Sequence, residues 1–155
     1  MSEGSFEEAQ SRAPIACPRD VAPPPGFAAH DLHDPFEALL GPYFERYEED
    51  GARVTAFILD DRHVNADGLA HEGMLMTFAD AKLGGAASRG ADGKACVTMS
   101  LQASFLGAAR LGDTIICRTR IEKKTRAVMF VSATFSVGDE PVMTATSLWK
   151  VLGER

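Results

Sequence analysis

The chain has 155 residues, of which 16 are Lys or Arg and 22 are Asp or Glu, so its formal net charge is −6. This acidic balance argues against a general nucleic-acid binder and against a protein that binds anionic membranes, because both need clustered positive charge. Hydrophobic residues make up 45% of the sequence, which is typical of a globular domain and excludes a fully disordered chain.

The N-terminal region differs in composition from the rest of the chain. Five of the eight prolines lie between positions 14 and 25, and three of them are consecutive. Proline lacks a backbone N–H and has a fixed φ angle, so this run excludes a helix or a central strand. We predict a Pro-rich arm over residues 1–30, either disordered or docked on a partner subunit, followed by one folded domain over residues 31–155.

The chain has no feature of a secreted or membrane protein. Its first residues are acidic and lack the apolar core of a signal peptide, and no apolar run approaches the roughly 18 residues that span a bilayer. Cys17, Cys96 and Cys117 lie far apart, which indicates reduced thiols and no zinc site. We therefore expect a cytoplasmic protein without a metal.

A short helix is the first element predicted in the folded domain. Asp34 can accept hydrogen bonds as an N-cap, Pro35 fits the first helical position and Glu37 fits the third. Gly41 and the proline after it end the helix.

Two strands and a tight loop follow. The ranges 43–47 and 53–59 have strand character, and the Asp50-Gly51 pair between them is typical of a hairpin turn. Residues 65–68, Asn-Ala-Asp-Gly, are turn formers and predict a tight loop.

The longest helix is predicted over residues 71–88. After its first turn it carries only two charged residues, Asp80 and Lys82. A helix that is apolar on nearly every side belongs in a core or a subunit interface. The Gly84-Gly85 pair weakens its last turns and allows an earlier end.

The C-terminal part of the chain has the pattern of a sheet. Residues 97–105 alternate between apolar and polar side chains without a break, with Thr98 on the polar side. Three further β-rich runs, over 113–122, 128–137 and 142–152, are separated by short turns. Successive strands with short turns form an antiparallel sheet, and one apolar helix on such a sheet gives an α+β fold.

Asp80 is the first candidate for a catalytic residue, because a carboxylate in an apolar stretch is costly to bury without a partner. For Asp80 the alternative is a position on a solvated face of the helix. His63 and Asn65 are also explained as loop residues, and Thr98 as one of several polar residues on its strand. His71 and Asp80 are about 13–14 Å of helix rise and 2.5 turns apart, so their side chains leave opposite faces. They can share an active site only if two copies of the helix pack antiparallel in a dimer or larger oligomer.

Three motifs give the chain a resemblance to a known family. The segment His63-Val64-Asn65-Ala66-Asp67-Gly68-Leu69-Ala70-His71-Glu72-Gly73, followed by Asp80, resembles the H-x-N-x-x-G-x-x-H-G-G loop and helix of hot-dog-fold thioesterases of the phenylacetate-degradation type. The ranges 97–101 and 105–113 are similar to two later motifs of that family. The resemblance spans about residues 34–152 and implies a hot-dog fold, an antiparallel sheet wrapped around a long central helix.

The resemblance implies hydrolysis of an acyl-CoA thioester without a metal or cofactor. Asp80 is the implied general base or nucleophile. The backbone N–H of Glu72 or Gly73 is the implied donor to the thioester oxygen, because a helix N-terminus favours developing negative charge. Glu72 stands where the family has glycine, which keeps the N–H but adds a carboxylate. Ala108 replaces a family proline, which affects only the rigidity of a turn.

Further roles follow from the same resemblance. His71 is implied to orient its loop or to bind the carbonyl region. Asn65 is implied to position water or substrate and to reach Asp80 of the other subunit. Thr98 matches a hydroxyl position that holds the attacking water.

The expected partners are acyl-CoA and further copies of the chain, as a dimer or a dimer of dimers. Four basic residues are candidates for binding the phosphates of CoA, and a solvated turn explains them equally well: Arg110, Lys123, Lys124 and Arg126. The identity and length of the acyl group are not specified by these motifs.

Two other functions are open from the sequence. A non-catalytic acyl-CoA-binding protein of the same fold is one, because the Glu72 carboxylate disfavours turnover. A hydratase or dehydratase of the same superfamily is the other, and it is disfavoured because its pairing of a catalytic acid with His is not found.

Overall fold

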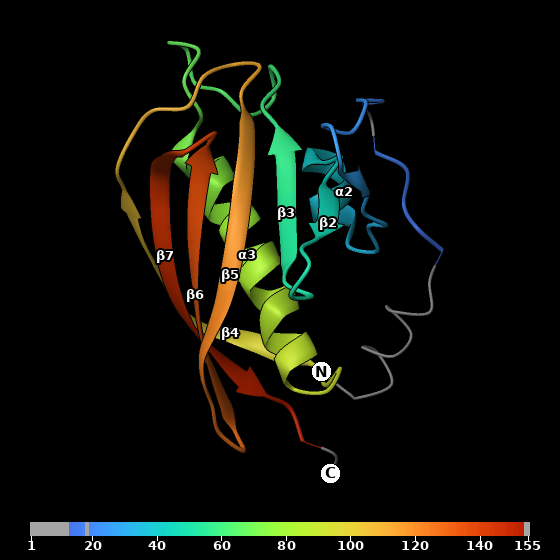
Figure 1. Cartoon of the computed structure of the whole chain (residues 1–155), viewed down its shortest axis with the longest axis vertical. Coiled ribbons are helices and arrows are strands. Elements are labelled where there is room, and N and C mark those ends of the chain that lie inside the picture. The colour runs from blue at the N-terminus through green and yellow to red at the C-terminus, as the bar shows by residue number, and fades with distance from the viewer. Residues whose placement is uncertain (1–12, 18, 154–155) are drawn as a thin grey trace.

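The computed structural model describes residues 13–17 and 19–153. Within these residues, seven strands form one antiparallel sheet in the order β1-β2-β3-β5-β6-β7-β4, and the long helix α3 lies across one face of it (Figure 1). The strands are β1 Ala28–Ala29, β2 Phe44–Tyr47, β3 Arg53–Ile58, β4 Cys96–Phe105, β5 Thr114–Lys124, β6 Val128–Val137 and β7 Glu140–Val151. The predicted α+β fold, with an antiparallel sheet wrapped around a central helix, is confirmed.

The short helix α2, Pro35–Leu40, begins where the sequence predicts it. The Asp34 carboxylate accepts the N–H groups of Phe36 and Glu37 at 2.8 and 3.1 Å, which satisfies donors that the first turn leaves free. Gly41 ends the helix, as expected.

The long helix α3, Glu72–Gly90, has His71 as its N-cap and extends past the predicted end at residue 88. The earlier end that Gly84-Gly85 allows is not observed, and Trp149 packs against the helix there. A Cβ on Gly84 would stand 2.7 Å from the Cη2 atom of Trp149. Only glycine therefore lets the indole ring lie against the helix backbone at this position.

An aromatic cluster fixes α3 against the sheet. Phe78 of α3 contacts Phe57 with ring centroids 4.5 Å apart, Tyr43 at 5.1 Å and Phe135 at 6.0 Å. All four rings are fully buried, and burial of each phenylalanine stabilises the fold by about 1.5–3 kcal/mol. This packing sets the rotation of α3 and hence the direction in which Asp80 points.

The strand β4 differs from the predicted pattern at its fourth residue, Met99. Its register against β7 shifts between Thr98 and Ser100, so Met99 is the extra residue of a β-bulge. Thr98 pairs with Trp149, whose ring packs on α3, and therefore lies on the helix side of the sheet. The prediction of an unbroken alternation, with Thr98 and Ser100 on one polar face, is wrong because the bulge reverses the phase.

The described part of the N-terminal region runs along the domain (Figure 1). The N–H of Ile15 donates to the carbonyl of Leu32 at 2.7 Å, and the Arg19 guanidinium pairs with Asp61 at 2.8 Å. Residues 1–12 and 18 of the predicted arm lie outside the described residues. The division of the chain at residue 31 stays a prediction.

Two observations bear on membranes and metals. No helix in the described part of the chain is long and apolar enough to cross a membrane. Among residues 13–17 and 19–153, no three His, Cys, Asp or Glu side chains are grouped to hold a metal ion. All three cysteines are free thiols, and the location of the protein in the cell stays a prediction.

Candidate active site

Asp80 and Thr98 form the first part of the candidate site. The Thr98 hydroxyl donates a hydrogen bond to Oδ1 of Asp80 at 2.9 Å. Asp80 is half-buried in the middle of α3, and Thr98 is exposed on the edge strand β4. Asp80 also borders two cavities, so its carboxylate is held on one side and accessible on another. This geometry suits a base that acts on a water molecule.

The N-terminus of α3 carries the predicted donors, and only one of them is open. Nδ1 of His71 accepts the N–H of Gly73 at 2.9 Å, so the Gly73 donor is occupied. The N–H of Glu72 meets no acceptor among the described residues. All three residues are exposed. The helix N-terminus therefore presents a free backbone donor at Glu72, where its dipole favours an anion.

Asn65 holds the loop before α3 with its own side chain. Its Oδ1 accepts the N–H groups of Asp67 and Leu69 at 3.0 and 3.1 Å, which confirms the predicted tight loop. The amide NH₂ group remains as a donor. Asn65 and Asp80 have no contact within one chain.

The first histidine of the motif, His63, is a buried structural residue with 1% exposure. Its Nδ1 accepts the N–H of Asp60 at 3.0 Å, and its Nε2 lies 2.7 Å from the carbonyl oxygen of Leu40. Because that carbonyl only accepts, the proton of the neutral ring is on Nε2. Burial lowers the pKa of His63, against the opposing effect of Asp60. These contacts are those of a structural loop histidine, which is the alternative stated above for His63.

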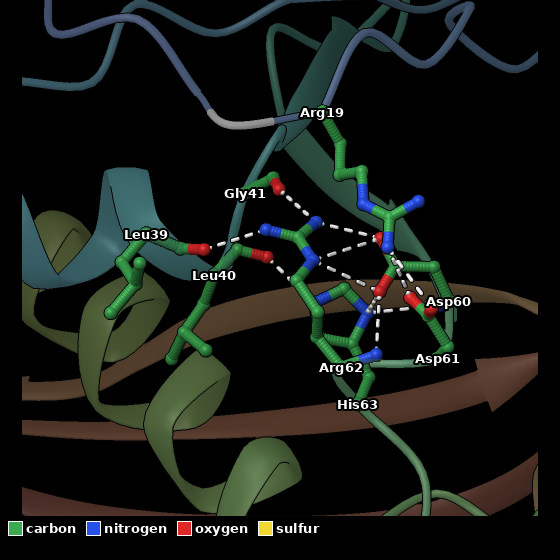
Figure 2. A network of polar contacts seen from close by, with 8 residues as sticks. All are labelled: Arg19, Leu39, Leu40, Gly41, Asp60, Asp61, Arg62 and His63. Carbon is green, nitrogen blue, oxygen red and sulfur yellow. Dashed lines mark hydrogen bonds and ion pairs between the residues drawn. The ribbon is translucent and has the colours of Figure 1, made fainter.

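Arg62, next to His63, makes further contacts with the end of α2, as Figure 2 shows. Its guanidinium donates to the carbonyls of Leu39 and Gly41 at 2.6 Å each and is paired with Asp60. These carbonyls belong to the C-terminal end of α2, where a helix has no internal donors left. Arg62 and His63 therefore tie α2 to the loop that leads into the motif, a role that no local sequence pattern indicates.

Lys82 is a second buried polar residue of this region. Among the charged residues of the predicted long helix, it is one of two after the first turn, and the sequence predicts no role for it. It is 5% exposed, and its ammonium lies 3.2 Å from Oε2 of Glu37 and 4.3 Å from the centre of the Tyr43 ring. Burial lowers the pKa of Lys82, and the Glu37 carboxylate counteracts that effect. The pair connects α2 with α3 next to Asp80.

The candidate CoA-binding residues fall into two places. Arg110 forms a β-bridge with Leu69 and therefore lies beside the loop that holds Asn65. Lys124 pairs with Asp92 at 2.9 Å, just beyond the C-terminal end of α3, and its neighbours Lys123 and Arg126 lie in the same hairpin. The four basic residues therefore do not form one cluster within a single chain.

A cavity of about 540 Å³ runs from Asp80 along α3. Its walls come from α3, from residues 30–34 with α2, and from parts of β3, β4, β5 and β7. Its lining includes Thr98 next to Asp80 and Arg89 near the C-terminal end of α3. The volume is in the range of small-molecule sites.

Comparison with known proteins decides the family. A family model described as the thioesterase superfamily matches residues 67–144. A protein of Pseudomonas aeruginosa named as an esterase is 35% identical over 127 residues, which cover 81% of this chain and 95% of that protein. The chain belongs to the thioesterase superfamily. The matched range contains the α3 N-terminus, Asp80 and Thr98, and it begins after Asn65.

Solved structures agree with this membership. A thioesterase of Ralstonia eutropha described as related to phenylacetic acid degradation is 28% identical, with a TM-score of 0.62 over 76% of this chain and 91% of that one. A Streptococcus mutans protein bound to acetyl CoA has a TM-score of 0.67 at 24% identity, over 76% of this chain and 94% of that one. The predicted resemblance to hot-dog thioesterases of the phenylacetate-degradation type is confirmed, and this superfamily member has the hot-dog fold.

Proposed function

We propose that the protein hydrolyses acyl-CoA thioesters at a site shared between two copies of the chain. The observation that carries this proposal is the Asp80 carboxylate, held at 2.9 Å by the Thr98 hydroxyl on the border of a cavity. Membership in the thioesterase superfamily supports the reaction class. The likeness to a structure bound to acetyl CoA supports the leaving group.

Asp80 acts on the acyl carbon directly or through water. As a general base, it takes a proton from a water molecule whose oxygen attacks the thioester carbon. As a nucleophile, it forms an anhydride that water then hydrolyses. In both routes the C–S bond breaks, CoA leaves as a thiolate that takes up a proton, and the acyl group is released as a free acid. The Thr98 hydroxyl keeps the carboxylate in place and helps to hold the attacking water.

The donor to the carbonyl oxygen comes from the second copy. Glu72 and Asp80 are about 12 Å apart along one helix axis, too far for both to reach the same carbonyl group. Two α3 helices that pack antiparallel bring the free N–H of Glu72 in one copy to Asp80 of the other. His71 orients that first turn, and the open amide of Asn65 reaches across to the same carboxylate. A two-fold axis makes two such sites.

The edge strand β4 is the proposed place of contact between copies. Its outer edge is unpaired within the described residues, and a long free edge is usually covered in stable proteins. Met99 and Phe105 on this strand are 56% and 46% exposed. Pairing of two β4 strands extends the sheet and sets the two helices side by side, as a dimer or as half of a dimer of dimers. It also brings Arg110 of one copy toward the Lys123–Arg126 hairpin of the other, which suits the phosphates of CoA.

Replacement of the carboxylate tests the proposal. We expect Asp80→Asn to lower kcat for thiol release by about 10³ or more, while size-exclusion chromatography shows an unchanged oligomer. Asp139→Asn is the matched control. Asp139 lies in the exposed turn between β6 and β7, and we expect this variant to keep wild-type activity. Wild-type rates in Asp80→Asn across a panel of acyl-CoA esters contradict the proposed mechanism.

A non-catalytic acyl-CoA-binding protein is the second candidate. The exposed Glu72 carboxylate favours it, because a negative charge beside the donor opposes a developing oxyanion. Thermal stabilisation by acyl-CoA without any release of free thiol supports this function, and rapid turnover excludes it.

A further inference from the structure

The cavity that begins at Asp80 continues toward the C-terminal end of α3, where it reaches Arg89. The helix rises about 13–14 Å between these two residues. The helix side of the cavity is lined by small residues, with the Trp149 ring against Gly84: Ala81, Gly84, Gly85 and Ser88. The side chains of Asp80 and Arg89 leave α3 in opposite directions, but both line this one cavity, so an acyl group that reacts at Asp80 can extend within it toward Arg89.

The wall that the sheet forms for this cavity becomes more polar toward Arg89. Every second side chain of β3 lies on the face toward α3, and these include Phe57, Thr55 and Arg53. The cavity is lined by Thr55 and Arg53 together with Thr119 of β5. Thr55 is only 4% exposed, and its hydroxyl meets the weakly hydrogen-bonding thiol of Cys117 but no other polar group of the described residues. An apolar chain against this wall leaves a buried hydroxyl poorly satisfied.

Arg89 is the unmatched charge at the far end of the cavity. The two other cations of the lining have carboxylate partners, since Lys82 pairs with Glu37 and Arg53 with Glu45. Within residues 13–17 and 19–153, no carboxylate forms an ion pair with Arg89. Arg89 is exposed at this end of the cavity. Partial burial, and after it the neighbouring Arg53 guanidinium, lowers the pKa of Arg89, while Tyr47 and Glu45 act in the opposite direction. A bound anion counteracts the repulsion between the two guanidinium groups.

On the basis of the thioesterase activity proposed above, we infer that the cavity takes acyl groups that end in a carboxylate. The substrates of this class are the CoA half-thioesters of dicarboxylic acids. The thioester carbon lies at Asp80, and the far carboxylate accepts two hydrogen bonds from the planar guanidinium of Arg89. The Thr55 and Thr119 hydroxyls line the polar end of the acyl chain. Water adds to the acyl carbon, the C–S bond breaks, and the products are the dicarboxylate and CoA.

Two substrates of equal chain length test this inference. Suberoyl-CoA ends in a carboxylate, and octanoyl-CoA ends in a methyl group. We expect the wild-type protein to hydrolyse suberoyl-CoA with the higher kcat/KM. We expect Arg89→Gln to lower the ratio of the two kcat/KM values by about tenfold or more, because a hydrogen-bonded ion pair is lost. Arg120→Gln is the matched control, since Arg120 is 79% exposed and pairs only with Glu122, and it keeps the wild-type ratio.

The outcome that overturns the inference is an unchanged ratio in Arg89→Gln. An equal loss for both substrates also overturns it, because Arg89 then acts on the CoA part that the two substrates share. Binding to Asp80→Asn separates this inference from the proposed reaction. Calorimetry with the same two esters, with and without Arg89→Gln, measures the preference for a terminal carboxylate even if neither ester is hydrolysed. A preference that Arg89→Gln abolishes supports the inference, and equal affinities for the two esters overturn it.

Discussion

The two halves of the proposed site are built in different ways. The carboxylate half is assembled within one chain, because Thr98 of β4 contacts Asp80 of α3 at 2.9 Å. The donor half is the exposed N–H of Glu72 at the beginning of the same helix, about 12 Å away along the axis. The aromatic cluster around Phe78 fixes the first half, whereas the second half faces outward. Under the proposed function, a single copy therefore carries two half-sites, and a second copy brings them together.

After replacement of Asp80, the largest expected effect comes from removal of the Glu72 donor without a change in the helix. Glu72 is the first residue of α3, where proline is well tolerated. His71 before it already has the extended backbone that precedes proline, with φ −69° and ψ 128°. We expect Glu72→Pro to lower kcat by about 10²–10³. Glu72→Ala is the control, because it removes the carboxylate and keeps the N–H. Equal activity of the two variants contradicts the role of this donor.

Mixing of variants tests whether the halves come from different chains. Glu72→Pro and Asp80→Asn each lose activity alone, but a mixed dimer has one site with both defects and one intact site. Half of the dimers in an equal mixture are mixed, so we expect recovery to about a quarter of wild-type activity after subunit exchange. No recovery, with mixed dimers demonstrated by mass spectrometry, places the whole site within one chain.

A smaller effect is expected from the hydroxyl in the carboxylate half. Thr98→Val keeps the shape of the side chain and removes the hydrogen bond to Asp80. Hydrogen bonds to charged groups contribute about 1.5–3 kcal/mol, so kcat should fall by about tenfold to a hundredfold. Thr98→Ser restores the hydroxyl and should recover most of the activity. If valine and serine variants have the same kcat, the contact in the free protein has no role in turnover.

The last expected effect is on stability and not on turnover, and it concerns His30 in the lining of the cavity. Burial, followed by the charges of Lys82 and Arg53, lowers the pKa of His30 to about 3, while Asp31 acts in the opposite direction. The unfolded chain takes up this proton near pH 6.5, whereas the folded chain does not. The free energy of unfolding therefore falls as the pH drops from about 6.5 toward 3, by at most about 1.4 kcal/mol per unit.

Chemical denaturation at several pH values measures this slope. His30→Gln should flatten it. The rest of the slope comes from His63, whose pKa burial also lowers, and from the carboxyl groups of Asp60 and Asp92. Against the effect of burial, Arg62 lowers the pKa of Asp60, and Lys124 lowers the pKa of Asp92. A slope that is unchanged in His30→Gln shows that this imidazole does not stay neutral in the folded protein.

Much of the local structure could be predicted from neighbouring residues. The Asp34 cap and the Pro35 start of α2 act within one turn. The loop held by Asn65 is likewise formed by contacts at most four residues apart. The start of α3 at His71 follows from the same kind of short-range hydrogen bond. The motif spacing around Asp80 identified the family correctly.

What the sequence could not predict are contacts between residues far apart in the chain. The bulge at Met99, which turns Thr98 toward α3, depends on how β4 pairs with β7. The packing of the Trp149 ring against α3 at Gly84 joins residues 65 positions apart in the chain.

Local sequence patterns predicted most of the elements, the family and the candidate site residues, because caps, turns and periodicity act over a few neighbouring positions. Contacts between distant segments determine which of these residues meet. They join Asp80 to Thr98, bury Lys82 against Glu37, and place Arg89 in the cavity lining without an ion pair to any carboxylate of the described residues. These outcomes depend on packing between distant segments, where the burial of large side chains outweighs any local preference.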